Sequence, residues 1–275
     1  MRCKGRSRPL THWYGARPVN DDSPTPSRRR FLQGVLATAL VAALPRRAEA
    51  FGEASRLSFA LLRHGGRWDV RPEGLPRLSW EISRRTSIDT SPQVRPLGLA
   101  DPELFHHPFA VLSSDQAVPM PSDAELAGLR RYLSYGGFLF IDDASATPQG
   151  PFEQSARALV AAALPGAQLK AIPRDHVLYK SFYLLSEPVG RAAVAPELFG
   201  IELGGRLAVV LCGNDLLGAL ARDPYGSWEF DATPGGEPQR EHAIRLGVNL
   251  VMYSMCLDYK EDQVHIPFIM KRRRI

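Results

Sequence analysis

Four short apolar segments of this sequence end in polar residues that could bind a ligand or take part in acid–base chemistry. The polar endings are His64-Gly65-Gly66, Ser113-Ser114-Asp115, Asp142-Asp143 and Asn214-Asp215. Carboxylates that meet at one place can hold a hard cation or act as acid and base. Turns between strands and helices are also rich in Gly, Asp, Asn and Ser for turn and cap chemistry alone, so a structural interpretation stays open beside the functional one.

A second group of reactive side chains lies in residues 176–183, where His176 and Lys180 stand among apolar and aromatic residues. Lys180 is either buried and paired, which would perturb its pKa, or it extends its ammonium group to the surface. The pair His106-His107 could suggest a metal site. Adjacent residues point apart in regular structure, so we expect surface histidines there instead. The sequence contains no nucleotide-binding glycine loop, zinc-protease motif or serine-hydrolase motif.

These residues need elements that position them, and the apolar pattern predicts an α/β fold. Short apolar runs alternate with helical segments, which is typical of a mostly parallel sheet flanked by helices. We expect strands at residues 57–63, 109–112, 138–141, 207–212 and 264–270, and helices at residues 74–87, 151–164 and 239–257. Trp80 falls off the apolar stripe of its helix, which would fit a helix that is covered on both sides.

A further helix is predicted to begin after Ser122, because Ser122 and Glu125 have the spacing of a capping box. Gly136-Gly137 should end it. Ligands bind beyond the carboxyl ends of the strands in open α/β sheets. We therefore expect any ligand to sit over one rim, made by Ser114, Asp115, Asp142, Asp143 and Asn214.

Residues 1–50 have the pattern of a twin-arginine signal peptide. Arg28 and Arg29 precede a 14-residue apolar run, which is shorter than the roughly 20 residues of a bilayer span, and a small-x-small cleavage pattern ends at Ala50. We expect removal of residues 1–50 and export of residues 51–275 as one folded α/β domain. The twin-arginine translocase would be its partner during export. The location would then be periplasmic or extracellular, with no transmembrane anchor in the mature chain.

The charge of the chain is divided unevenly. The formal net charge is +5, yet residues 51–275 carry 24 Lys and Arg against 26 Asp and Glu. A nucleic-acid function is therefore not expected. The basic run at residues 271–274 is either a solvated tail or a contact for anionic lipid or a partner. Cys212 and Cys256 both lie in apolar runs, where they are either two buried thiols or a disulfide.

Several motifs together resemble a known family. They include His64-Gly65-Gly66 with Trp68-Asp69, residues 101–105, Gly136-Gly137 before Asp142-Asp143, residues 176–183 and Asn214-Asp215. From about residue 57 to 274 the chain resembles a bacterial domain of unknown function, number 4159. The portion that runs from the helix through Gly136-Gly137 to Asp142-Asp143 is similar to the flavodoxin-type fold of class I glutamine amidotransferases.

The resemblance has implications for function. Active amidotransferases of that superfamily place a nucleophilic Cys at the turn where this chain has Ser113-Ser114-Asp115, so the resemblance implies a domain without that nucleophile. It also implies, as partners, cell-envelope modules that carry an AAA-type ATPase and von Willebrand A domains. We expect an exported domain that binds a ligand or partner. The alternatives are a metal-assisted hydrolase that uses the strand-end carboxylates and a structural envelope protein without ligand. The sequence indicates no cofactor and no particular reaction.

Overall fold

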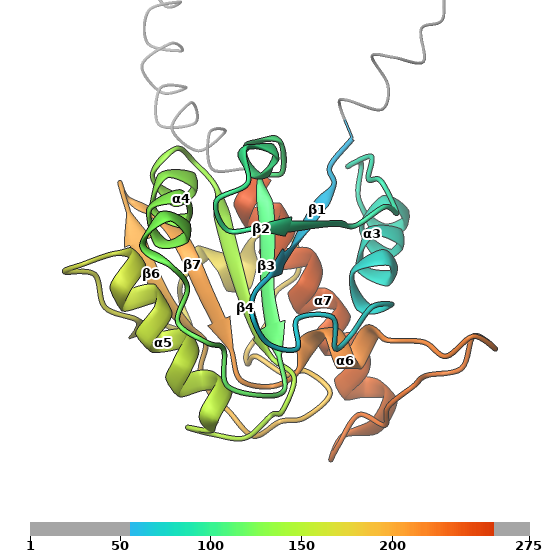
Figure 1. The fold of residues 1–275 in the computed structure, drawn as a ribbon. Coiled ribbons are helices and arrows are strands. Elements are labelled where there is room, and N and C mark those ends of the chain that lie inside the picture. Colours follow the sequence, from blue (N-terminus) through green and yellow to red (C-terminus); the bar gives the residue numbers. More distant parts are fainter. Residues whose placement is uncertain (1–55, 256–275) are drawn as a thin grey trace, which may run out of the picture. The chain divides into compact units, whose positions relative to one another are not determined.

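A seven-stranded sheet forms the centre of residues 56–255, the part of the chain that the computed structural model describes (Figure 1). The strand order is β2-β1-β3-β4-β7-β6-β5. The first five strands in this order run parallel, whereas β6 and β5 are antiparallel additions at one edge. The strands are β1 (Phe59–Arg63), β2 (Arg95–Gly98), β3 (Phe109–Ser114), β4 (Phe138–Asp143), β5 (Lys170–Ala171), β6 (Phe199–Leu203) and β7 (Arg206–Cys212).

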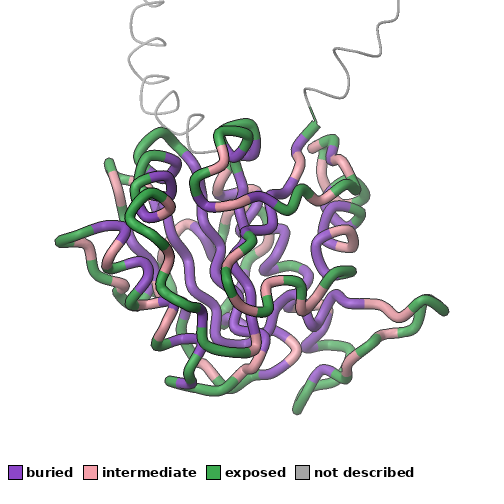
Figure 2. Tube along the Cα trace, in the orientation of Figure 1, coloured by how far each residue is buried: buried purple, intermediate pink, exposed green. Residues whose placement is uncertain are grey.

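Helices cover both faces of the sheet. One face carries α3 (Gly74–Arg85), α6 (Leu216–Leu220) and α7 (Gly236–Met255), and the other carries α4 (Asp123–Ser134) and α5 (Pro151–Ala163). In β4, Phe138 and Phe140 pack in the core on the side of α3, α6 and α7. Leu139 and Ile141 pack in the core on the side of α4 and α5. The central strands are buried on both faces, as Figure 2 shows, which explains their continuous apolar sequences.

The strand order makes this a mostly parallel α/β fold of the flavodoxin-like kind, as the sequence predicts. The chain passes from β1 outward to β2 and then returns to β3 on the other side of β1. The crevice between β1 and β3 is therefore the topological switch point. The carboxyl ends of β1, β3, β4 and β7 lie along the lower edge of the sheet in Figure 1. We call this edge the carboxyl edge.

The capping box predicted at α4 is confirmed. The Ser122 hydroxyl accepts a hydrogen bond from the Glu125 amide, and the Glu125 carboxylate accepts one from the Ser122 amide at 2.9 Å. The helix is anchored at its other end by Tyr132, whose buried hydroxyl donates to the carbonyl oxygens of His107 and Phe138. These contacts fix the position at which β4 enters the sheet.

Several boundaries differ from the sequence prediction. β3 and β4 each continue two residues further, because Ser113 pairs with Asp142 and Ser114 pairs with Asp143 in the parallel ladder. α7 begins three residues earlier than expected, and α3 ends at Arg85. The strand expected at residues 264–270 lies outside the described residues. The sequence pattern did not predict β2, β5, β6 or α6, nor the short 3-10 helices η1 (Pro102–His106) and η2 (Val177–Lys180).

Two predictions about side-chain burial are wrong. Trp80 is 48% exposed, so α3 is not covered on that side. An arginine of the same helix, Arg77, lies over its ring. His106 is at the surface as expected, but His107 is buried and its Nδ1 lies 2.8 Å from the Ser58 hydroxyl. Within residues 56–255 no helix is both long and apolar enough to cross a membrane.

Candidate functional site

Asp142 lies at the carboxyl edge on the face of the sheet that packs against α6. Its side chain is fully buried. Its two carboxylate oxygens accept hydrogen bonds from the amides of Leu216 and Leu217, at 2.8 and 2.9 Å, at the start of α6. The carboxylate of Asp142 therefore ties β4 to the helix that follows β7.

Asp215 is the second buried carboxylate on this face and sits next to Asp142 in the network. The backbone of Asp215 is left-handed, with φ 52°, and its Oδ1 accepts a hydrogen bond from the Gly218 amide at 3.0 Å. Arg71, from the loop after β1, donates to both oxygens at 3.0 and 2.8 Å, and Arg191 donates through its Nε. Asp215 thus joins three distant segments of the chain and caps α6.

Asp143 turns to the opposite face, because successive side chains of a strand alternate. It is 1% exposed. Its Oδ1 accepts hydrogen bonds from the amide and hydroxyl of Ser145, whereas its Oδ2 has no hydrogen-bond partner among the described residues. Its strand neighbour Ser114 is fully buried, and the Ser114 hydroxyl accepts a hydrogen bond from the Gln116 amide. The structure therefore brings Asp142 and Asp215 together, whereas the Asp143 side chain faces the other side of the sheet.

Burial controls the ionisation of these groups. It raises the pKa of Asp142 to about 8, with the nearby Asp215 carboxylate acting in the same direction and the two α6 amides opposing it. Burial also raises the pKa of Asp143, against the hydrogen bonds from Ser145. The Cys212 thiol at the end of β7 is fully buried, and burial raises its pKa well above the ordinary value. A thiol in this environment is a poor nucleophile.

The topological switch point contains His64, Gly65 and Asp115. His64 Nδ1 accepts a hydrogen bond from the Gly66 amide at 3.0 Å, and its Nε2 lies 3.4 Å from the Ser113 carbonyl oxygen. Partial burial lowers the pKa of His64, so its neutral form is favoured. Asp115 forms an ion pair with the exposed Arg67 at 2.6 Å. Gly65 is exposed beside this pair and has room for a side chain.

Asn214 makes four hydrogen bonds and is fully buried. Its Oδ1 accepts from the amides of Val194 and Ala195, and its Nδ2 donates to the carbonyl oxygens of Pro188 and Ala195. All of the hydrogen-bonding capacity of this amide is used to hold the loop before β6. Asn214 therefore positions the Arg191 loop against the carboxyl edge.

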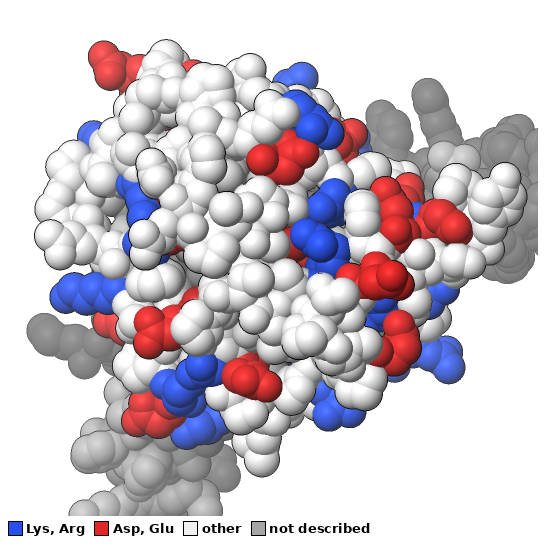
Figure 3. Space-filling view, turned by 90° about the horizontal axis from the view of Figure 1, so that it is seen from below, with Lys and Arg blue, Asp and Glu red and all other residues white. Residues whose placement is uncertain are grey.

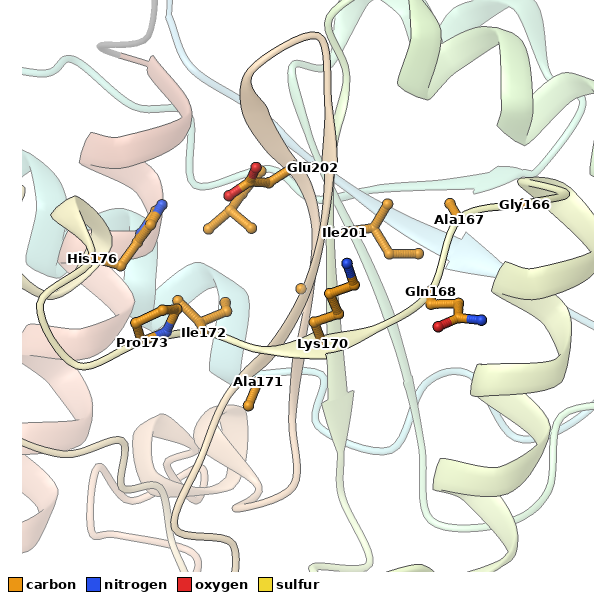
Figure 4. A pocket seen from close by; sticks show the side chains of 12 residues that line it. Gly166, Ala167, Gln168, Lys170, Ala171, Ile172, Pro173, His176, Ile201 and Glu202 are labelled. Atoms are coloured by element: carbon orange, nitrogen blue, oxygen red, sulfur yellow. The ribbon is translucent and has the colours of Figure 1, made fainter.

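His176 and Lys180 lie away from these residues. His176 caps η2, its Nδ1 accepting from the Leu178 amide, and Lys180 is exposed. His176 also borders a cavity of about 560 Å³ at the β5–β6 edge of the sheet, together with Lys170 and Glu202. Figure 4 shows Glu202 and His176 on one side of this cavity, with Gln168 and Ala167 on the other.

The arrangement offers few groups for catalysis. The Ser113 hydroxyl donates to the Asp142 carbonyl oxygen, and both Ser113 and Ser114 are buried, so no hydroxyl faces a ligand at the end of β3. Across residues 56–255, no group of three or more His, Cys, Asp or Glu side chains is arranged to hold a metal ion. The sequence prediction also missed Arg71 and Arg191. Both are single arginines in irregular loops, where no periodicity identifies a partner.

Charges of both signs are interspersed at this end of the molecule. Figure 3 looks onto the carboxyl edge and shows Lys and Arg side chains next to Asp and Glu side chains, without a continuous region of one sign. Phe230 lies within this region, and the Arg71 guanidinium stacks on its ring at 4.2 Å from the centroid. The exposed surface here is mixed, whereas the buried carboxylates of Asp142 and Asp215 below it are already bound by groups of the protein.

The strand order and the polar carboxyl edge define the class of the protein as a flavodoxin-like α/β domain. Within that class, the profile of the family described as Domain of unknown function (DUF4159) matches residues 58–255, and the chain belongs to this family. No curated protein matches the chain.

Proposed function

We propose that this protein is an exported domain of the cell envelope that binds a partner or ligand, and that its carboxyl edge maintains the fold instead of catalysing a reaction. The observation that carries the proposal is that the carboxylate oxygens of Asp142 and Asp215 already accept hydrogen bonds from other groups of the protein. The amides of Leu216 and Leu217 bind the Asp142 carboxylate, and Arg71, Arg191 and the Gly218 amide bind the Asp215 carboxylate. A general acid or base needs a proton-accepting atom that faces the substrate, and these atoms face the protein.

The end of β3 supports the same proposal. An amidotransferase-like frame would carry its nucleophile there, and this chain has two serines whose hydroxyls are buried and hydrogen-bonded. Under this proposal the domain keeps a frame of that type and uses its surface for recognition. Envelope modules with an AAA-type ATPase and von Willebrand A domains are the partners that the family resemblance suggests.

One observation favours the alternative, a metal-assisted hydrolase. Asp143 Oδ2 is buried and lacks a hydrogen-bond partner within residues 56–255. A cation bound there would satisfy it. The two proposals differ in a measurable property, which is the metal content of the protein.

The test is elemental analysis of the full chain after expression with its own leader and purification without chelators. The binding-domain proposal predicts well below one equivalent of any divalent metal, in the wild type and in Asp143→Asn alike. One equivalent in the wild type that is lost in Asp143→Asn would overturn it in favour of the hydrolase. The variant Asp175→Asn is the matched control, because Asp175 is exposed.

Export is the other part of the proposal, and it rests on Arg28, Arg29 and the cleavage pattern at Ala50. Replacement of both arginines by lysine keeps the charge but removes the twin-arginine signal. We expect the double variant to accumulate in the cytoplasm with its leader attached, while the wild type is recovered from the periplasm beginning at Phe51. Unchanged export of the double variant would contradict the twin-arginine route.

A further inference from the structure

We propose that this protein hydrolyses esters of short acyl groups at the amino edge of its sheet, with Ser58 as the nucleophile, His107 as the general base and Glu103 as a positioning residue. This activity goes beyond the proposed binding function and uses none of the residues of the carboxyl edge. The amino edge consists of the residues just before β1 and β3, and it lies opposite the carboxyl edge, at the top of the sheet in Figure 1.

The parallel pairing of β1 with β3 brings Ser58 and His107 together. Phe59 of β1 is the ladder partner of Phe109 of β3, so the residues that precede the two strands are neighbours. The backbone of His107 is fixed on both sides, because its amide closes η1 and its carbonyl oxygen accepts a hydrogen bond from the buried Tyr132 hydroxyl at 2.9 Å. The base and the nucleophile are therefore held in position before a substrate binds.

The imidazole of His107 is a base within reach of the Ser58 hydroxyl. Its Nδ1 lies 2.8 Å from Ser58 Oγ and 3.3 Å from the Ser58 carbonyl oxygen. His107 is 5% exposed, so little water competes for this nitrogen. By contrast, the hydroxyls of Ser113 and Ser134 donate to backbone carbonyl oxygens, which do not take up a proton. Of these three serines, Ser58 is the one whose neighbour can activate it as a nucleophile.

Glu103 favours the tautomer of His107 that this role requires. Glu103 Oε1 lies 3.9 Å from His107 Nε2, the ring nitrogen that does not face Ser58. A carboxylate at this distance favours a proton on Nε2, and Nδ1 then accepts the hydrogen bond from the Ser58 hydroxyl. The same carboxylate stabilises the imidazolium that forms when the serine proton is transferred. Serine, imidazole and carboxylate therefore stand in the order that acyl transfer needs.

The cavity beside these three side chains indicates the substrate. They line one cavity of about 640 Å³, which is within the size range of small-molecule sites. The other lining residues are Arg56, Ser91, Pro92, Gln93, Arg95 and His106. Among the described residues of this lining, Pro92 is the one without a polar side chain, so a long hydrocarbon chain would bury little apolar surface here. The cavity therefore fits a short acyl group, such as acetyl, on a polar alcohol.

The reaction is acyl transfer through Ser58. Ser58 Oγ attacks the ester carbonyl carbon while its proton moves to His107 Nδ1, and the carbonyl oxygen becomes an oxyanion in a cavity that Arg56 and Arg95 line. The bond from the carbonyl carbon to the alcohol oxygen then breaks, and the alcohol leaves with the proton from His107. Water attacks the acyl-serine ester in the same way, which releases the carboxylic acid and restores the Ser58 hydroxyl. Water is the only co-reactant.

The first measurement is covalent labelling of the full chain with a fluorophosphonate, which forms an Oγ–phosphorus bond with an activated serine and releases fluoride. We expect one equivalent of adduct in the intact mass, located at Ser58 by peptide mapping. His107→Gln should slow labelling about tenfold or more, because an amide cannot take up the serine proton. The matched control is Ser91→Ala, since Ser91 lines the same cavity and is half-buried like Ser58. This control should be labelled at the wild-type rate.

The second measurement is steady-state hydrolysis of p-nitrophenyl acetate and p-nitrophenyl octanoate. We expect kcat/KM for the acetate to exceed that for the octanoate about tenfold or more, and Ser58→Ala to abolish the protein-dependent rate. Glu103→Gln should lower kcat several-fold and leave KM within about twofold of the wild type. This split is expected because Glu103 acts on the imidazole and not on the bound ester.

Three results would overturn the inference. The first is a wild type that stays unlabelled at a fluorophosphonate concentration that fully labels a reference serine esterase. The second is an adduct at a residue other than Ser58, or one that forms equally fast in His107→Gln. The third is hydrolysis of the acetate at the same rate in wild type and Ser58→Ala, or faster hydrolysis of the octanoate. Labelling of the wild type needs no variant to fold, so the test remains decisive if a variant is unstable.

Discussion

Replacement of Asp215 by Asn should destabilise the protein substantially without altering its shape. The carboxylate is fully buried, and Arg71 and Arg191, which bind it, have side chains that are 13% and 24% exposed. Loss of one partner from a fully buried ion pair costs about 3–5 kcal/mol. The two arginines reach some solvent here, so we expect a loss of about 2–4 kcal/mol from the free energy of unfolding.

A second variant separates the charge from the helix cap. Asn at position 215 can still accept from the Gly218 amide and tolerates the left-handed backbone, whereas Ala can do neither. Asp215→Ala should therefore lose about 2 kcal/mol more than Asp215→Asn, from the cap and the backbone together.

The assay is urea unfolding, followed by circular dichroism, of wild type, Asp215→Asn, Asp215→Ala and the exposed control Asp175→Asn. The control should stay within about 0.5 kcal/mol of the wild type. Equal midpoints for wild type and Asp215→Asn would refute the reasoning, because Asp215 would then contribute nothing to the network. Equal losses in the two Asp215 variants would refute the capping role alone.

Three further predictions concern other parts of the fold. Burial and the neighbouring Asp215 carboxylate raise the pKa of Asp142 to about 8. The wild type should therefore lose stability relative to Asp142→Asn as the pH rises from about 4 to about 8, since the unfolded carboxyl ionises first. If the urea midpoint of the wild type stays constant relative to that of Asp142→Asn over this pH range, or rises relative to it, the predicted direction is wrong. Ser122→Ala should lower the free energy of unfolding by about 0.5–2 kcal/mol through loss of the α4 cap, and an unchanged denaturation midpoint would exclude that role. Gly128→Ala should lower the thermal midpoint, because the added Cβ would lie 2.6 Å from the Leu99 carbonyl oxygen. This steric clash should cost more free energy than the roughly 1 kcal/mol by which Ala stabilises a helix relative to Gly. A raised thermal midpoint of Gly128→Ala would show that the backbone near Leu99 shifts to make room for the added methyl group.

The sequence was sufficient for the central layers of the fold. The continuous apolar runs of β3 and β4 predict buried parallel strands, and the spacing of Ser122 and Glu125 predicts the start of α4. β2 and β6 were missed for different reasons. β2 contains Pro and Gly, so pairing with β1, and not local preference, makes it a strand. β6 alternates its apolar residues with Gly200 and Glu202, which is a strand pattern that a search for continuous apolar runs does not detect.

The candidate site was predictable only in part. Its residue types could be read from the polar strand endings, but the partners of those residues could not. Arg71 and Asp215 are separated by 144 positions in the sequence, and no local pattern links them. The opposite directions of Asp142 and Asp143 follow from the continuation of β4 to its last residue, and periodicity alone does not determine where a strand ends.

The central claim is that the carboxylates of Asp142 and Asp215 at the carboxyl edge are bound by the protein and not open to a ligand. Its most direct test is amide hydrogen exchange at Leu216, Leu217 and Gly218, measured by NMR in the native protein. Asp142 and Asp215 accept hydrogen bonds from these three amides, and all three residues are buried. If the edge is a structural network, the three amides should exchange only through global unfolding, as slowly as the core of β4, and Asp142→Asn should speed up exchange at Leu216 and Leu217 first. Exchange at the rate of an exposed loop would show that the carboxylates are open to solvent and ligand, and would contradict the account.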